Sequence, residues 1–231
     1  MIYENMVKAT FIKRPNRFIA HCIVNGKEEV VHVKNTGKCR ELLIEGCTVY
    51  LQKHDNPNRK TKYSLISVLK GNRLINMDSQ VPNKVVYEAL VNKDIILPGL
   101  DEEINYIKAE KTYKSSRFDI YIETENKKAF VEVKGVTLEE DGVVLFPDAK
   151  TERGVKHINE LIEASKDGYI SYTLFVIQMK GVKYFTPNTK MHEEFANVLK
   201  NASLNKVNVL AYDCNLDYKS ISINEKVKVI L

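Results

Sequence analysis

Two runs decide the fold of the second half of the chain: Arg117-Phe118-Asp119-Ile120-Tyr121-Ile122 and Ala129-Phe130-Val131-Glu132-Val133-Lys134. Apolar residues alternate in both runs, which is typical of β-strands that place one face on a core. The alternation puts Asp119 opposite the core-facing side of the first run, and it puts Glu132 and Lys134 together on the corresponding side of the second. The core-facing residues of the first run are predicted to be Phe118, Ile120 and Ile122.

Glu125-Asn126 lies between the two runs and can form a tight turn. A hairpin centred there sets Asp119 across from Glu132, with Cβ atoms about 5 Å apart, and like charges directly opposite destabilise a sheet. A turn at Lys114-Ser115 would set Glu110 across from Asp119 as a third acid. A hard divalent cation suits such oxygen-only ligands. The alternative is that these acids are ordinary solvated strand residues.

Longer motifs around these acids resemble known patterns. The spacing Asp119-x12-Glu132-x-Lys134 on adjacent strands resembles the PD-(D/E)XK nuclease motif. Five further motifs are similar to the sugar fermentation stimulation protein A (SfsA) family: Asn16-Arg17-Phe18, His32-x-x-Asn35-Thr-Gly37, Glu110-x-x-Tyr113-x-Ser-Ser-Arg117-x-Asp119, Glu132-Val-Lys-Gly-Val-Thr137 and Phe146-Pro-Asp-Ala-x-Thr151-x-Arg153-Gly-x-Lys156-His157. The resemblance therefore covers essentially the whole chain.

The nuclease resemblance implies a site that hydrolyses a phosphodiester with Mg²⁺ or Mn²⁺ as cofactor. It implies Asp119, Glu132 and the main-chain carbonyl of Val133 as metal ligands. Lys134 would orient or acidify the attacking water and offset developing charge. Glu110 either holds a second ion or its hydration shell, or is a plain strand-edge acid, and the sequence leaves both open.

Basic residues near these acids indicate where a phosphate would bind. Arg153 and Lys156, one turn apart on a predicted helix, and Arg117, on the acidic side of its strand, are placed to bracket a phosphate. Asp148 precedes that helix, which favours capping of its exposed N–H groups over metal binding. His157 is either a neighbour of this site or a hydrogen-bonded packing residue, and we assign it no proton-transfer role.

The N-terminal part reads as short strands around Asn25-Gly26, a strong hairpin signal. Strands are predicted at residues 17–24, 28–33, 48–53, 62–69 and 73–77. Such a series of short strands predicts a small barrel. The family resemblance implies an OB-like barrel, a fold that often presents a basic, partly aromatic face to nucleic acid.

Basic and aromatic residues of this barrel are candidate DNA contacts. They are Arg14, Arg17, Phe18, Lys34, Lys38 and Arg40. The alternative is scattered surface charge, since a small barrel serves many functions. Thr36-Gly37-Lys38 is similar to the end of a phosphate-binding loop, but His32 stands five positions before Gly37 and Cys39 replaces the hydroxyl residue. We therefore expect no nucleotide cofactor.

Pro82 marks the boundary between two predicted domains, 1–82 and 83–231, because the residue before a proline is pushed towards extended geometry. A helix is predicted from there up to the stop at Leu97-Pro98-Gly99. Strands follow at 104–112, 117–122 and 129–136, then a helix at 151–166, a strand at 171–178, a helix at 191–200 and a strand at 207–212. The strand-helix-strand order favours a parallel crossover. The fold class is mixed α/β, and the resemblance implies a restriction-endonuclease-like domain with a mixed sheet.

Composition limits the partners of the chain. A formal charge of +5 permits nucleic-acid binding without demanding it. The sequence has no run near the roughly 20 apolar residues of a bilayer span and no signal-peptide pattern, so we expect a cytoplasmic protein with no membrane partner. Its four cysteines form no Cys-x-x-Cys pair, which makes zinc and a disulfide framework unexpected.

Two classes of function fit these observations. The first is a DNA endonuclease or exonuclease that depends on Mg²⁺ or Mn²⁺. The second is a non-specific DNA-binding regulator of sugar metabolism with nuclease architecture but no physiologically important cleavage. The two acids favour the first, because binding alone has no use for repelling carboxylates beside a phosphate path. A phosphohydrolase acting on small phosphoesters is a third, weaker candidate. DNA binding should be weakly sequence-selective, since no recognition helix stands out.

Overall fold

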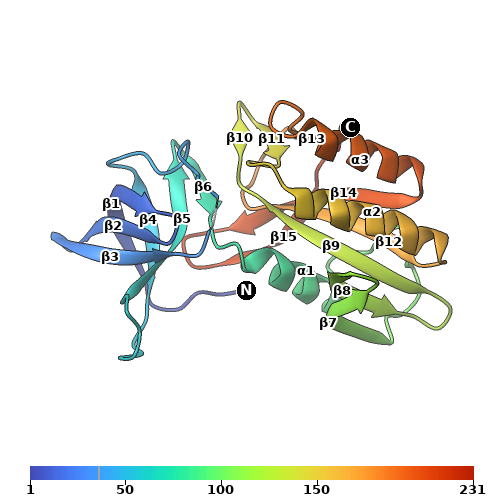
Figure 1. Cartoon of the computed structure of the whole chain (residues 1–231). Helices are drawn as coiled ribbons and strands as arrows, with labels where there is room; N and C mark the ends of the chain where they lie inside the picture. The colour runs from blue at the N-terminus through green and yellow to red at the C-terminus, as the bar shows by residue number, and fades with distance from the viewer. Residues whose placement is uncertain (36) are drawn as a thin grey trace.

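The computed structural model describes residues 1–35 and 37–231, and it places an N-terminal barrel beside a larger α/β unit (Figure 1). Thr36, which belongs to the rejected phosphate-loop pattern, lies outside the described residues. Within those two ranges, none of the helices combines the length and the apolar character needed to cross a membrane.

The N-terminal sheet closes into the predicted small barrel. Its strands are β1 (Met6–Asn16), β2 (Ile19–Val24), β3 (Lys27–Val33), β4 (Thr48–Lys53), β5 (Tyr63–Lys70) and β6 (Arg73–Asn76). They follow the order β3-β2-β1-β4-β5-β6. β3 also pairs with β5 in parallel, at Val31↔Tyr63. This pairing closes the first five strands into a barrel. The small β-barrel that the sequence predicts is therefore confirmed.

The longest strand of the barrel, β1, was not predicted. Lys8 and Lys13 interrupt its apolar residues and Pro15 lies near its end, so its sequence gives no clean alternation. In the structure β1 pairs with both β2 and β4 and buries Ala9 and Phe11. Pairing with a strand on each side therefore explains why this segment is extended, although its own apolar pattern does not predict a strand.

The second unit is built on a mixed six-stranded sheet, which confirms the predicted mixed α/β class. Its strands are β7 (Tyr106–Tyr113), β8 (Ser116–Glu123), β9 (Lys128–Val136), β12 (Ile170–Ile177), β14 (Val207–Leu216) and β15 (Ile221–Lys226). The order is β15-β14-β12-β9-β8-β7. β7, β8 and β9 are antiparallel, whereas β12 runs parallel to β9 and to β14. A small sheet that was not predicted joins β10 (Glu139–Glu140), β11 (Val143–Phe146) and β13 (Tyr184–Pro187).

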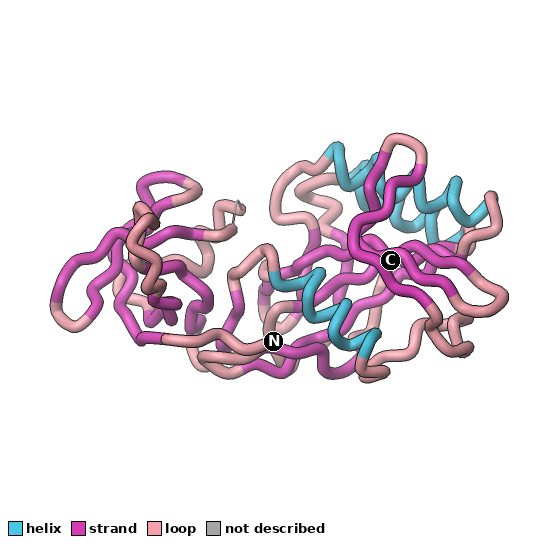
Figure 2. Tube along the Cα trace, turned by 90° about the horizontal axis from the view of Figure 1, so that it is seen from below, coloured by secondary structure: helices cyan, strands magenta, loops and turns pink. Residues whose placement is uncertain are grey.

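Helices cover both faces of the six-stranded sheet. They are α1 (Val81–Val91), α2 (Glu152–Lys166) and α3 (Glu193–Leu204). α1 lies on one face and the pair α2 and α3 on the other (Figures 1 and 2). α1 ends well before the predicted stop, because Asn92 caps its last turn and Lys93 turns the chain with a left-handed φ of 61°.

The burial of both sheet faces corrects the prediction that the acids stand opposite a single core. Ile120 and Ile122 pack with α1, whereas Phe118 packs with the α2 and α3 core. Regular pairing of β7 with β8 skips Glu110 and Asp119, and Glu110 has a left-handed φ of 58°. The strand irregularity therefore falls at the acids, so the strict alternation on which the prediction depended is broken there.

Candidate active site

Asp119 is held at the point where β8 leaves its regular pairing with β9. The turn at Glu125-Asn126 and the predicted register are confirmed, because Ile120 pairs with Val131, one position short of the predicted Asp119 pair. One carboxylate oxygen of Asp119 accepts the N–H of Val133 at 2.8 Å. The other accepts Nδ2 of Asn83, from the first turn of α1, at 2.7 Å. Three elements of the second unit thus meet at this carboxylate.

Glu132 lies in the middle of β9 and is only 2% exposed. Its Oε1 atom accepts from Nζ of Lys134 and from Nδ1 of His157, both at 2.5 Å. Its Oε2 atom is buried and has no hydrogen-bond partner among the described residues. A buried carboxylate oxygen without a partner is destabilising and calls for an explanation.

His157 joins this site from α2. Nε of Arg153 donates to Nε2 of His157 at 3.3 Å, so Nδ1 carries the proton of the neutral ring and donates it to Glu132. His157 therefore contacts a predicted metal ligand directly. The sequence left its role open, and the signal that could have found it is the Arg153–His157 spacing, which places the two side chains one turn apart on one helix face.

The pKa values of the two acids are shifted in opposite directions. Burial raises the pKa of Asp119 above its ordinary value, and the nearby carboxylate of Glu132 raises it further. Burial alone would raise the pKa of Glu132 too, but the hydrogen bond from His157 and the charge of Lys134 outweigh it and lower that pKa. Asp119 is therefore the acid whose ionised form would gain most from a bound cation.

Glu110 and Arg117 lie beside this cluster on adjacent strands. The predicted register of β7 and β8 is confirmed at Lys111↔Phe118, which puts Glu110 level with Asp119. The carboxylate of Glu110 forms an ion pair with Arg117 at 3.5 Å, and both side chains are 61% exposed. A second ion at Glu110 remains a prediction.

The loop before α2 departs from prediction at Asp148. Thr151, not Asp148, caps the helix, because its side chain accepts the N–H of Gly154 at 3.0 Å. Asp148 lies beside Gly37 of the barrel, where an added Cβ would collide with its carboxylate. Both residues line a small polar cavity between the barrel and the second unit, together with Gln178. The loop before α2 thus contacts the barrel.

Arg153 and Lys156 are exposed at the start of α2, as a phosphate contact requires. Lys156 also donates from Nζ to the carbonyl of Ser115 at 3.1 Å, which ties α2 to the turn between β7 and β8. Both basic residues therefore lie on the same helix as His157, which contacts Glu132.

Two of the predicted DNA contacts on the barrel are occupied within the protein. The guanidinium of Arg14 donates to four main-chain carbonyls of the surrounding loops. Nζ of Lys34 lies 2.9 Å from the buried carboxylate of Asp78. We therefore leave both residues out of the DNA surface. The remaining candidates are exposed: Arg17, Phe18, Lys38 and Arg40.

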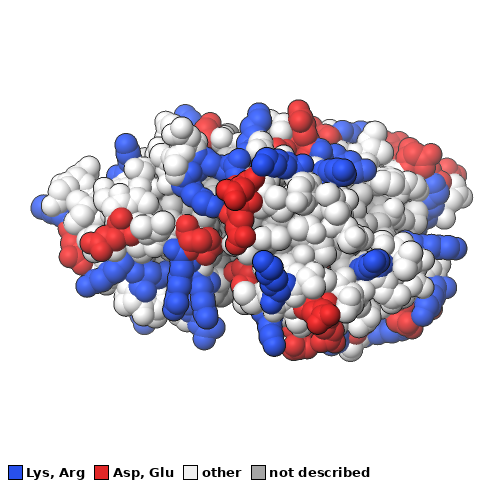
Figure 3. Space-filling view, turned by 90° about the horizontal axis from the view of Figure 1, so that it is seen from above, with Lys and Arg blue, Asp and Glu red and all other residues white. Residues whose placement is uncertain are grey.

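The exposed barrel candidates include an aromatic contact. The Arg17 guanidinium lies 5.2 Å from the centroid of the Phe18 ring, and Phe18 is 49% exposed. Seen from above, Lys and Arg side chains gather where the barrel meets the second unit, next to a smaller patch of acids (Figure 3). Positive charge on this face thus continues from one unit to the other.

A second group of potential metal ligands lies at the starts of α2 and α3. Glu152, His192 and Glu194 place ligand atoms within 4.8 Å of one another. Nδ1 of His192 accepts the N–H of Thr151 at 3.4 Å, so Nε2 of the neutral ring carries the proton and faces the two carboxylates. Both acids also lie at helix N-termini, where negative charge is favoured. This group is therefore explained without a metal.

Comparison with known proteins confirms the resemblance to the SfsA family. Family models match at residues 12–77, the SfsA N-terminal OB domain, and at residues 80–220, the sugar fermentation stimulation protein RE domain. Sugar fermentation stimulation protein homologs of Clostridium beijerinckii and Desulfitobacterium hafniense are 57% and 55% identical over 231 residues, which cover 100% of this chain and 100% and 99% of theirs. The structure of Pyrococcus furiosus SfsA in complex with Ca²⁺ superposes with a TM-score of 0.87 at 26% identity, covering 100% of this chain and 98% of that one. The chain belongs to the sugar fermentation stimulation protein family.

Proposed function

We propose that this chain is a divalent-metal-dependent nuclease that hydrolyses phosphodiester bonds of DNA through a PD-(D/E)XK site. The observation that carries the proposal is the buried Oε2 atom of Glu132, which has no partner within residues 1–35 and 37–231 and lies next to a second carboxylate, Asp119. Two buried carboxylates that repel each other destabilise the folded protein unless a positive charge compensates them. A hard cation shared by both would supply the missing partner.

The donor set fits Mg²⁺ or Mn²⁺, because Asp119, Glu132 and the carbonyl of Val133 offer oxygen ligands alone. When bound, the ion would make a water more acidic and stabilise the charge that develops on the phosphate. His157 holds Oε1 of Glu132 and so leaves Oε2 available. The ammonium of Lys134, 2.5 Å from Oε1, is close enough to orient a water at the same site.

The Pyrococcus furiosus relative supports a cation in this family. That protein was determined in complex with Ca²⁺, a hard cation that takes oxygen ligands as Mg²⁺ does. In this chain the oxygen-only cluster at Asp119 and Glu132 is the candidate for an equivalent ion, since the group at His192 is explained by its own hydrogen bonds.

Exposed basic and aromatic groups support DNA as the substrate. Arg17 and Phe18 offer a phosphate contact and a stacking surface on the barrel, and Lys38 and Arg40 add charge next to Gly37, which lies beside Asp148 of the second unit. These groups contact the backbone or stack on any base, so binding should be weakly sequence-selective and should weaken steeply with salt.

The second candidate is a DNA-binding regulator of sugar metabolism that does not cleave, which would fit a family named for the stimulation of sugar fermentation. A pure binder would use the same basic surface. It would gain nothing from Asp119 and Glu132, whose charges repel phosphate. The two candidates therefore differ at the acids and not at the basic residues.

The decisive experiment measures cleavage of plasmid, linear and single-stranded DNA by the parent and by Asp119→Asn, with Mn²⁺, Mg²⁺ or EDTA. Asp119→Asn keeps the shape of the side chain and removes one charge. We expect it to abolish metal-dependent cleavage while DNA binding in EDTA stays equal or becomes tighter. Lys134→Ala should also lose cleavage but retain Mn²⁺ binding, because a protonated lysine offers no ligand.

Matched controls are Asp94→Asn and Lys128→Ala, which change exposed residues away from the cluster. Both should cleave like the parent. A parent protein that cleaves no form of DNA across a range of Mn²⁺ and Mg²⁺ concentrations would leave the binder as the better account. Salt-insensitive turnover of a small phosphoester instead would indicate a phosphohydrolase.

A further inference from the structure

We propose that Asn83 is a positioning residue for the metal site, which orients Asp119 without contacting the ion or the substrate phosphate itself. This inference rests on the nuclease function proposed above. It assigns to α1 a part in a site whose predicted residues all come from β7, β8, β9 and α2. Three features of the fold support this role: the contact with Asp119, the anchoring of α1 on β9, and the anchoring of the chain that leads into α1.

The contact with Asp119 fixes the plane of its carboxylate. Oδ2 accepts the main-chain N–H of Val133 at 2.8 Å, and Oδ1 accepts Nδ2 of Asn83 at 2.7 Å. One donor would leave the carboxylate free to rotate about its Cβ–Cγ bond, whereas two donors on different oxygens set its orientation. The main-chain donor belongs to the strand, so Asn83 is the part of this arrangement that a substitution can remove.

Asn83 is held firmly because the first turn of α1 abuts β9. A Cβ atom added to Gly135 would lie 2.7 Å from Cγ of Pro82 and 2.6 Å from Oε1 of Gln178, closer than real contacts allow. Gly135 directly follows Lys134, so this close approach occurs at the end of the acidic cluster. Glycine there lets Pro82, the residue before Asn83, pack against the strand that carries Glu132.

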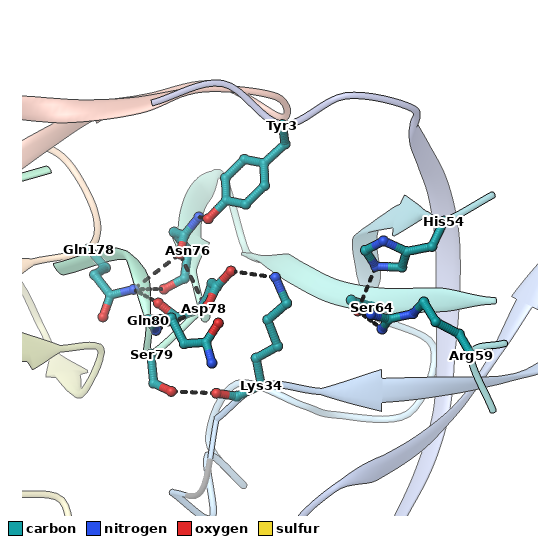
Figure 4. A network of polar contacts seen from close by, with 10 residues as sticks. All are labelled: Tyr3, Lys34, His54, Arg59, Ser64, Asn76, Asp78, Ser79, Gln80 and Gln178. Atoms are coloured by element: carbon teal, nitrogen blue, oxygen red, sulfur yellow. Dashed lines mark hydrogen bonds and ion pairs between the residues drawn. The ribbon is translucent and has the colours of Figure 1, made fainter. Parts of the chain in front are cut away.

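The chain that leads into α1 is anchored by a polar network at the junction of the barrel and the second unit (Figure 4). Nε2 of Gln178 donates at 3.1 Å to the carbonyls of Asn76 and Asp78 and to Oδ1 of Asn76. One carboxylate oxygen of Asp78 accepts from Lys34 of the barrel at 2.9 Å, and the other accepts the N–H of Gln80 at 3.0 Å. Gln80 is the residue before α1.

This network gives Asn83 a fixed place relative to both sheets. Asn76, Asp78 and Gln178 are each at most 2% exposed, so their hydrogen bonds form away from water and are costly to break. A donor on a loosely held segment could follow a misplaced carboxylate, whereas the exposed Asn83 side chain extends from an anchored helix turn and so favours one orientation of Asp119. Residues that orient metal ligands in this manner typically change metal affinity or activity by about 10- to 100-fold when replaced.

The test compares Asn83→Leu, which keeps the size and removes the donor, with Asn83→Gln, which keeps the donor on a longer arm. For each protein one measures the Kd for Mn²⁺ without DNA, kcat and KM on DNA, and Tm in EDTA. We expect Asn83→Leu to weaken Mn²⁺ binding and lower kcat by about 10-fold or more, with KM and Tm near those of the parent. Asn83→Gln should recover part of both losses.

Asn201→Leu, an exposed change on α3, is the matched control and should behave like the parent. If Asp119→Asn abolishes cleavage while Asn83→Leu keeps the Mn²⁺ Kd and kcat of the parent, Asn83 has no positioning role and the nuclease function stands. If Asn83→Leu also lowers Tm and Asn83→Gln restores Tm but not Mn²⁺ affinity, the role is structural and the inference is wrong. If the parent binds no Mn²⁺ and cleaves no DNA, the proposed function fails and this inference fails with it.

Discussion

Two buried glutamates, Glu132 in the middle of β9 and Glu139 in β10, differ in how their carboxylate oxygens are hydrogen-bonded. Glu139 is 6% exposed, and both its oxygens are occupied: Oε1 accepts from Gly142 N–H at 2.5 Å and lies 2.6 Å from Arg73, and Oε2 lies 2.8 Å from Lys70. Glu132 is 2% exposed and has both its donors on one oxygen. Both carboxylates are buried, but only that of Glu139 has a hydrogen-bond or ion-pair partner for each oxygen among the described residues.

That difference separates a carboxylate that is satisfied within the protein from one that a bound ligand could complete. Lys70 and Arg73 belong to the barrel and Glu139 to the second unit, so this satisfied group joins the two parts. At Glu132 the donors are arranged so that one oxygen has no partner in the part of the chain that the structure describes, beside Asp119. Folding alone would favour a completed group, as at Glu139. The incomplete group is the one that a ligand can complete.

Matched Glu→Gln substitutions test this comparison most strongly. Glu132→Gln should lower metal-dependent cleavage by about 10³-fold, since several kcal/mol of charge stabilisation depend on the ion. It should lower the free energy of unfolding by less than Glu139→Gln does, because desolvation of Glu132 and its repulsion with Asp119 offset the loss of its hydrogen bonds. Glu139→Gln should retain Mn²⁺ binding and lower the free energy of unfolding by about 2 kcal/mol, or Tm by about 4–8 °C. The expected loss of free energy is smaller than for a fully buried ion pair, because Lys70 and Arg73 remain partly hydrated.

Chemical denaturation in EDTA and a cleavage assay on the same preparations separate the two effects. Glu140→Gln, an exposed neighbour of Glu139, serves as the control and should change neither quantity. Equal losses of stability in both variants would show that Glu132 is a structural carboxylate like Glu139 and would contradict a metal-binding role for Glu132.

A smaller effect is expected in the pH dependence of stability. Burial alone would raise the pKa of Glu139, but hydrogen bonds from Lys70 and Gly142, with the charges of Lys70 and Arg73, outweigh it and lower the pKa below the usual 4.5. Such a group contributes stability that is fully present above pH 4.5 and is lost as pH falls through the lower folded-state value. The difference between parent and Glu139→Gln should therefore shrink below pH 4.5.

Asp119 should show the opposite sign in the same experiment. Its pKa is raised in the folded protein, mainly by burial and then by Glu132, so its ionised form opposes folding at neutral pH. In EDTA, Asp119→Asn should be more stable than the parent at neutral pH, and this advantage should disappear as pH falls through the raised pKa of Asp119. Denaturant unfolding across this pH range measures both signs, and a destabilised Asp119→Asn would contradict the second.

The sequence predicted what local signals determine and missed what distant packing determines. The turn at Glu125-Asn126 and the alternating strands around it predicted the β8–β9 register, because that pairing depends on neighbouring residues. The contact of Glu132 with His157 spans 25 positions and that of Asp119 with Asn83 spans 36. Each depends on where a helix packs against the sheet. The Arg153–His157 spacing indicates a shared helix face, but it does not indicate which strand that face meets. The orphaned oxygen is likewise visible only after folding.

The smallest effects are expected in the barrel, where contacts are exposed and individually weak. Stacking of a base on an aromatic ring contributes about 1–3 kcal/mol, so Phe18→Leu should weaken DNA binding by about 5-fold or more, whereas Phe18→Tyr, which keeps the ring, should bind like the parent. Arg17→Ala should weaken binding to all sequences alike and reduce the slope of log Kd against log salt by about 1, since one phosphate contact is lost. The Kd for Mn²⁺ should stay unchanged in all three variants, because these residues lie on the barrel and the acids lie on the second unit. Filter binding or fluorescence anisotropy at several salt concentrations measures these changes. If folded Phe18→Leu and Arg17→Ala proteins bind DNA with the affinity and salt slope of the parent, the barrel is not part of the DNA surface, and DNA recognition must come from the basic residues around the acids alone.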